Sequence, residues 1–204
     1  MNFGVLRSVR VISPALTDEI IFEIKHLLRQ LRLRGLAEFA FYLAAEQTQE
    51  VLMTSFWWQM QDLQEANEAL NLALSQKLRG RAELLESYIF QMIWDYRRFP
   101  VPTQSSVVRL LTLPDGYPNE NVNKNIRATR RFVEKRPDVL AAWIGRTPNE
   151  GKYILYRTDW ASIEAQQAYF KAEPVQQAIL AYRASNIILN YASFTLQSII
   201  KPEE

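Results

Sequence analysis

Alternating and helical runs of apolar side chains follow one another in a regular order along the first half of the chain. Residues 3–12 alternate apolar side chains with Arg and Ser, which predicts a strand. Over residues 17–31 apolar side chains recur at helical spacing, and Arg32, Arg34 and Gly35 follow, which is typical of an amphipathic helix. Residues 37–45 and 51–58 alternate again and predict a hairpin. A second helix and a fourth strand complete the order β-α-β-β-α-β, at residues 63–78 and 88–96.

The second half of the chain repeats this order after an interruption that contains prolines. We interpret residues 99–103 as a short, stiff linker. The repeated strands and helices are predicted, in chain order, at residues 107–113, 121–135, 139–146, 152–158, 162–170 and 187–199, and the last helix resumes at residues 175–182 after an interruption at Pro174. Similar residues in the two halves lie about 100 positions apart, as Trp58 and Trp160 do, which predicts an internal duplication.

Each half is therefore expected to form one module, the first at residues 1–98 and the second at residues 104–204. Such a module is a four-stranded antiparallel sheet with both helices on one face. The other face also carries apolar side chains, since residues 37–45 place Phe41 on one side of their strand and Tyr42 on the other. An exposed apolar face of this size favours aggregation. Because packing the two sheets face to face buries both surfaces, we predict an α+β protein whose sheets form one barrel within the chain.

The amino-acid composition of the chain argues against several classes of function. The chain has 24 basic and 22 acidic side chains, a balance that argues against a dedicated nucleic-acid-binding protein. It has no cysteine and one histidine, so we expect no disulfide, no metal site and a cytoplasmic location. No stretch is long and apolar enough to predict a membrane span or a signal peptide. With six glycines and no phosphate-binding motif, a nucleotide-binding loop is not expected.

The second module carries the residues of a family resemblance. The strand at residues 152–158 leads into Trp160 and a helix with the pattern W-x-S-x-E-A-x-x-x-Y/F, which ends at Tyr169 and Phe170. This stretch resembles the antibiotic-biosynthesis-monooxygenase-like (ABM) family of the dimeric α+β barrel superfamily, in a fused two-module form. The first module is similar to it more weakly, through Trp58 and its following helix. The resemblance implies tandem ferredoxin-like βαββαβ modules that form an intramolecular dimeric α+β barrel.

The resemblance also implies a choice of chemistries. Some members of the family oxidise aromatic substrates with O2 and without metal or flavin, in a pocket between helices and sheet. Others degrade haem with an Asn, a Trp and an axial His, but residues 175–182 contain no His and the first strand of each module contains no Asn. We therefore expect a cofactor-independent monooxygenase, or a related enzyme, that acts on a small apolar or aromatic molecule. The alternative is a non-catalytic small-ligand-binding or scaffold protein with the same barrel.

Candidate site residues cluster in the second module. Small neighbours flank Trp143 and leave space for a ligand beside its ring. On the adjoining strand, Tyr153 and Tyr156 would orient a phenol, and Arg157 would stabilise an enolate or peroxide anion. The alternative interpretation is that these aromatic residues only pack the core. The catalytic candidates are Trp143, Tyr153, Tyr156 and Arg157, and the expected ligand-binding residues are Trp143, Tyr169 and Phe170.

Two questions about partners stay open at the level of sequence. Arg127, Arg130 and Arg131 share one face of the helix at residues 121–135. This face either is solvated, with cations near the helix C-terminus that favour its dipole, or binds an anionic partner. A fused chain of this kind is either a monomeric pseudo-dimer or a homodimer.

Overall fold

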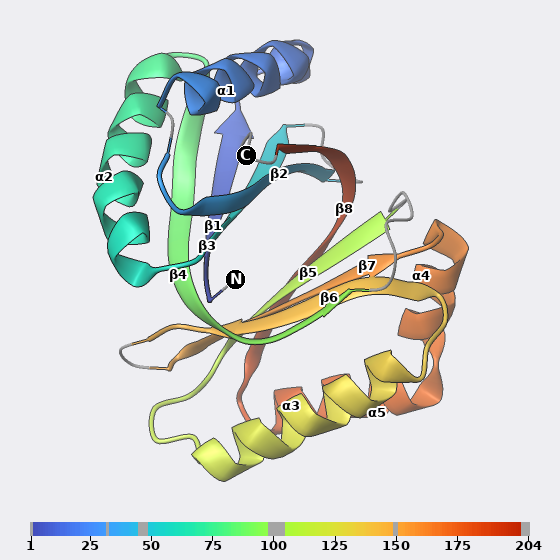
Figure 1. Ribbon diagram of the computed structural model, residues 1–204. Helices are drawn as coiled ribbons and strands as arrows, with labels where there is room; N and C mark the ends of the chain where they lie inside the picture. Colours follow the sequence, from blue (N-terminus) through green and yellow to red (C-terminus); the bar gives the residue numbers. More distant parts are fainter. Residues whose placement is uncertain (1, 32, 45–48, 98–104, 149–150, 201–204) are drawn as a thin grey trace. The chain divides into compact units, whose positions relative to one another are not determined.

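The computed structural model describes residues 2–31, 33–44, 49–97, 105–148 and 151–200 (Figure 1). The chain divides into two compact units. The first unit is formed by Met1–Met92 together with Phe194–Glu204, and the second by Ile93–Ser193. Within the described residues, no helix carries an apolar stretch of the length that a bilayer crossing requires.

The first unit has a sheet with two helices on one face (Figure 1). Its elements are β1 (Phe3–Val11), the short 3-10 helix η1 (Pro14–Leu16), α1 (Thr17–Leu31), β2 (Leu36–Ala44), β3 (Glu50–Trp57), α2 (Met60–Lys77) and β4 (Ala82–Arg97). These strands lie in the order β4-β1-β3-β2, and every neighbouring pair is antiparallel. This is the strand order of a ferredoxin-like βαββαβ unit.

The apolar periodicity of the sequence explains how this unit packs. Ile20, Ile24 and Leu28 lie on one face of α1 and are buried, while Asp18 and Glu19 in its first turn favour the positive end of the helix dipole. The same core contains side chains from β2, β3 and α2, including Phe39, Phe41, Met53, Trp57, Leu63 and Leu70. Helices and sheet are therefore held together by the apolar rows that the alternation predicts.

The second unit repeats the arrangement with one additional helix break. Its elements are β5 (Ser105–Thr112), α3 (Asn119–Glu134), β6 (Val139–Arg146), β7 (Tyr153–Trp160), α4 (Ile163–Lys171), α5 (Glu173–Ala184) and β8 (Ile188–Ile200). The strands again lie in the order last-first-third-second, as β8-β5-β7-β6. Ala172 adopts an extended conformation and Pro174 lies in the first turn of α5, so the helix of the second crossover is broken in two.

Two long strands contribute residues to both units. In the first unit, β2 pairs with β8 from Ala44 opposite Phe194 to Phe39 opposite Ile200, so the sheet gains a fifth strand. The last residues of β4, from Ile93 onward, belong to the second unit. Each unit is thus completed by a strand end from another part of the sequence.

The predicted α+β class and the tandem ferredoxin-like order of elements are confirmed. The expected linker at residues 99–103 lies outside the described residues, so the module bounds at 1–98 and 104–204 stay predictions. The packing of the two sheets into one barrel likewise stays a prediction. One detail of the repeat is wrong by one position. Trp57, opposite Phe3, and Trp160, opposite Ser105, occupy equivalent places, whereas the side chain of Trp58 is 54% exposed.

Candidate functional site

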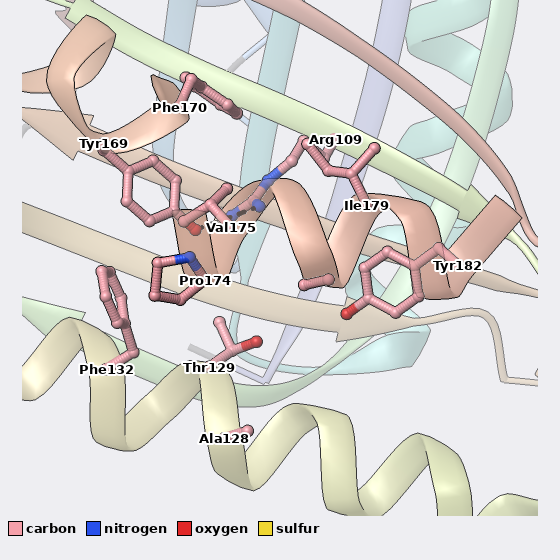
Figure 2. A pocket seen from close by; sticks show the side chains of 11 residues that line it. Arg109, Ala128, Thr129, Phe132, Tyr169, Phe170, Pro174, Val175, Ile179 and Tyr182 are labelled. Carbon is pink, nitrogen blue, oxygen red and sulfur yellow. Dashed lines mark hydrogen bonds between the residues drawn. The ribbon is translucent and has the colours of Figure 1, made fainter. Parts of the chain in front are cut away.

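A cavity of about 200 Å³ lies between the helices and the sheet of the second unit (Figure 2). Strand β5 and helices α3, α4 and α5 all contribute to its walls. The lining side chains are mainly apolar or aromatic: Arg109, Ala128, Thr129, Phe132, Tyr169, Phe170, Pro174, Val175, Ala178, Ile179 and Tyr182. Arg109 is the one charged residue in this set. A pocket with apolar walls and few polar groups is typical of a small-molecule site.

Arg109 reaches the cavity because of its position in β5. Val107 and Leu111 lie two residues before and after it and are buried in the cores beneath the helices. Since side chains alternate along a strand, Arg109 belongs to the same row and points toward the helices. Figure 2 shows its guanidinium directed toward Tyr169. A cation thus stands in a row that is otherwise apolar.

The guanidinium of Arg109 is surrounded by aromatic rings. Its central carbon lies 5.7 Å from the ring centre of Tyr156, 5.9 Å from that of Tyr169 and 6.0 Å from that of Phe170. Nη1 donates one long hydrogen bond of 3.5 Å to the Tyr169 hydroxyl, and the buried Nε has no hydrogen-bond partner. Within the described residues, no carboxylate pairs with Arg109. Among the residues that the structure describes, ring faces and one hydroxyl therefore offset its charge.

The positive charge of Arg109 also affects the pKa values of two further tyrosines, Tyr156 and Tyr182. Burial raises the pKa of the Tyr156 hydroxyl above its usual value, and the positive charge of Arg109 opposes that effect. Burial also raises the pKa of Tyr182, again with Arg109 acting in the opposite direction. Both hydroxyls consequently stay protonated at neutral pH and can donate a hydrogen bond to an anionic oxygen.

Helix α4 places Tyr169 beside Arg109. The Ser162 hydroxyl accepts a 3.1 Å hydrogen bond from the backbone N–H of Ala165 and so caps the start of the helix. The Tyr169 ring then packs against Trp160 and Phe132, with ring centres 4.9 Å and 5.1 Å apart. This aromatic cluster fixes one wall of the cavity.

The structure brings some of the expected site residues together and separates others. Tyr169 and Phe170 line the cavity, and Tyr156 contacts Arg109 from β7. Trp143 on β6 is buried opposite Arg157 in the strand register, and neither is among the residues that line this cavity. Tyr153, Trp143 and Arg157 all belong to the row that alternates with Tyr156, on the sheet face away from the helices.

The charge of Arg157 is already neutralised. Its Nε and Nη2 donate to the two carboxylate oxygens of Asp159 at 2.8 Å and 2.5 Å, and the Ser106 hydroxyl donates to the same carboxylate at 2.8 Å. Both partners of this ion pair are buried. The pair therefore explains Arg157 without a ligand.

Arg109 was missed by the sequence analysis, although the sequence carries a signal for it. It is the only charged residue in the β5 stretch, and an arginine at a core-facing position of a strand needs a partner. Arg7 gives a second signal. It follows Phe3 by the same four positions that separate Arg109 from Ser105, and Phe3 and Ser105 face equivalent tryptophans.

Arg7 shows what the same position becomes when the protein itself satisfies it. It is fully buried, and its guanidinium donates to Asn71 Oδ1 at 2.9 Å, Asn67 Oδ1 at 2.6 Å and Ser55 Oγ at 3.2 Å. Burial lowers the pKa of Arg7 to about 10. Helix α2 thus supplies two amides to the arginine of the first module. The equivalent arginine of the second module meets aromatic rings and a cavity.

Several solved structures share this fold. An anthrone oxidase-like protein superposes with a TM-score of 0.78 at 13% identity, over 100% of this chain and 94% of that chain. A proposed monooxygenase from Fusobacterium nucleatum subsp. nucleatum gives 0.75 at 8% identity, over 98% and 94%. A ferredoxin-fold protein related to antibiotic biosynthesis monooxygenases, from Listeria monocytogenes, gives 0.55 at 11% identity, over 97% and 96%. The chain has the fold of these monooxygenase-related ferredoxin-fold proteins.

This similarity concerns the fold alone, because all three sequence identities are too low to infer a shared activity. No protein-family model matches the chain, and no curated protein matches it. The fold agrees with the resemblance carried by Trp160, Tyr169 and Phe170, two of which line the cavity. The chemistry of the site therefore has to be argued from its own residues.

Proposed function

We propose that the protein is an ABM-like, cofactor-independent monooxygenase that acts on a small apolar or aromatic molecule bound in the cavity of the second unit. The observation that carries the proposal is Arg109, a cation without a carboxylate partner in the described residues, set among aromatic walls. The solved proteins of the same fold support it, since two of those compared bear oxidase or monooxygenase names.

The chemistry requires a substrate anion. A neutral closed-shell organic molecule reacts slowly with O2, whereas a carbanion or phenolate can transfer an electron to it. Arg109 provides a positive field that lowers the pKa of an acidic C–H or O–H held beside it, and the proton leaves to solvent. The low polarity of the walls strengthens this field. A tyrosine hydroxyl, such as that of Tyr182, donates a hydrogen bond to the developing anion.

The balanced reaction converts a CH2 group of the substrate to a carbonyl. Two C–H bonds break, one atom of O2 becomes the carbonyl oxygen, and the other leaves as water with the two hydrogens. O2 is the oxidant, and the substrate carbon is oxidised. The chain's own residues bind the ring between apolar walls and stabilise the anion.

Oxygen consumption by the full chain tests the proposal. We would supply a panel of one-ring phenols that carry an oxidisable CH2 group, with three-ring anthrone as a size comparison, follow O2 with an electrode, and use 18O2 to locate the label. Wild type should place one labelled atom in the product and one in water.

Arg109→Gln should lower kcat/KM by about 100-fold or more, as expected for a lost anion-stabilising group. Arg131→Gln, which removes an exposed charge of the same unit, should leave it unchanged. Uptake no faster than a protein-free blank across the panel would refute the activity.

One observation favours a second candidate, a protein that binds the ligand without transforming it. None of the eleven residues that line the cavity is Asp, Glu or His, so the walls offer no ordinary general base. In that case a ligand would bind with an Arg109-dependent affinity and be recovered unchanged after prolonged incubation in air. Mass spectrometry of the extracted ligand separates the two candidates.

A further inference from the structure

We propose that the cavity of the second unit selects a molecule of about one aromatic ring that carries an ionised oxygen acid before any reaction, and that this anionic oxygen pairs with Arg109. The inference rests on the proposed function, because it assigns the substrate class of the same site. It separates the cavity from one built for a neutral, several-ring molecule.

Three other arginines that are buried or half-buried each have polar partners. Arg7 is satisfied by two Asn side chains and a serine, Arg157 by Asp159, and Arg136 by Asp138. Arg109 alone among these four has a buried guanidinium nitrogen without a hydrogen-bond partner in the described residues.

A partly buried cation with an unsatisfied N–H is unfavourable in the absence of a partner. An incoming anion would restore the charge balance by pairing with the end of the guanidinium, because Nε itself is buried and out of reach of a ligand in the cavity. A guanidinium is also suited to this role, because its planar fork can hold one or two anionic oxygens. Aromatic rings around the group do not remove the need, since a ring face stabilises a cation without accepting an N–H hydrogen bond in the plane of the guanidinium or neutralising its charge.

Size gives the second constraint. The cavity holds about 200 Å³, and an apolar cavity of about 150 Å³ accommodates benzene. One ring with one or two small substituents therefore fits. A fused three-ring molecule would require the walls to move.

The distribution of polar groups gives the third constraint. Pro174, Val175 and Ile179 form an apolar wall on α5, and Phe132 and Tyr169 close the opposite side (Figure 2). The charged group enters from β5 alone. The complementary ligand is amphipathic, with one anionic end toward β5 and an apolar ring between α3 and α5. This excludes both a purely apolar hydrocarbon and a sugar-like polar molecule.

The experiment uses 4-nitrophenol, whose ionisation is visible by absorbance and occurs near neutral pH. We expect wild type to bind the phenolate at least tenfold more tightly than the neutral phenol, so that the apparent pKa of the bound probe falls. Nitrobenzene, with a similar ring and no acid, measures the contribution of ring burial. Benzoate tests whether a carboxylate serves as well as a phenolate oxygen. The comparison of ionised and neutral probe on wild type needs no variant.

Two variants locate the effect. Arg109→Met should weaken nitrophenolate binding at least tenfold and change nitrobenzene binding less than twofold. The control Arg131→Met removes an exposed charge from α3 and should change neither.

The proposal is overturned if the neutral phenol binds as well as the phenolate, if Arg109→Met leaves the preference intact, or if no one-ring acid binds at millimolar concentration. Failure of the proposed oxygenase activity is a separate result, because a protein that binds nitrophenolate through Arg109 and consumes no O2 keeps this inference and loses the reaction.

Discussion

Arg7 and Arg109 occupy equivalent strand positions. Comparing them distinguishes an arginine with a structural role from one that is proposed to bind a ligand. Arg7 has three hydrogen bonds to uncharged partners and no exposed surface, so its loss leaves two amides and a hydroxyl without their donor. Within the described part of the chain, Arg109 has one hydrogen bond of 3.5 Å and an unsatisfied Nε. A group whose hydrogen bonds the protein satisfies contributes to stability, whereas the charge of Arg109 has no carboxylate partner among the described residues and can pair with a ligand.

Alanine substitution at the two positions should therefore have unequal effects on stability. We expect Arg7→Ala to lower the free energy of unfolding by more than about 2 kcal/mol, through orphaned polar groups and a new cavity. Arg109→Ala should change it by less than about 1 kcal/mol in either direction, because it also relieves an unsatisfied buried N–H. Urea titration of both variants measures the difference. Equal losses would mean that Arg109 is a structural residue.

The buried tyrosine of the site predicts how stability changes at high pH. Burial raises the folded-state pKa of Tyr156 above its ordinary value of 10. Above about pH 10 the unfolded chain therefore loses this proton before the folded chain does, and stability falls as pH rises. Tyr156→Phe removes the effect, so its stability should fall less than that of wild type between about pH 9 and about pH 11. Denaturant midpoints at both pH values test this, and parallel pH dependences would contradict it.

At the level of single residues, the sequence predicts which residue types are important more reliably than it predicts the direction in which their side chains point. Tyr169 and Phe170 were found through their helix pattern, and they line the cavity. Trp143 and Arg157 were chosen for their neighbours in sequence, but strand alternation places them in the row away from the helices. Which of two adjacent rows faces a cavity depends on where the helices pack, and single-residue chemistry does not contain that information.

Helices and strands were easier to predict than side-chain contacts. The apolar stripe of α1 and the alternation of β3 each specify an element and its buried face. Strand β4 is longer than its alternating pattern of residues 88–96 indicates, because it spans Ala82–Arg97. Backbone pairing can extend a strand beyond its clearest alternation, since hydrogen bonds with neighbouring strands do not depend on side-chain type.

The start of α4 provides a test at the level of the element. Ser162 caps this helix through its hydroxyl, whereas Gln59 at the corresponding end of α2 makes no side-chain cap. We expect Ser162→Ala to lower the free energy of unfolding by about 1 kcal/mol, the usual effect of losing a cap. Gln59→Ala should change it by less than about 0.5 kcal/mol and serves as the control. Thermal or urea denaturation measures both. Equal effects would show that the cap does not stabilise α4.

The duplication is visible in the sequence as a whole, but one consequence of the fold is not. A repeat of β-α-β-β-α-β predicts two self-contained modules in two halves of the chain. The first unit instead includes Phe194–Glu204, and β2 pairs with this distant end of β8. The pairing is made by backbone groups of Phe39–Ala44. Because it does not depend on side-chain type, the side-chain pattern around β2 does not predict it.

A chain that ends after residue 97 should therefore be incomplete, although it contains every element of the first module. Without residues 194–200, β2 becomes an edge strand with unpaired N–H and C=O groups beside the apolar side chains Phe39 and Phe41. We expect the fragment to self-associate or unfold under conditions in which the full chain stays folded. Backbone amides of residues 39–43 should also exchange with solvent at least about 100-fold faster. Light scattering and hydrogen–deuterium exchange test both expectations, and a synthetic peptide of residues 188–200 should partly restore the protection. A monomeric fragment with protected β2 amides would show that the first module folds without the end of the chain.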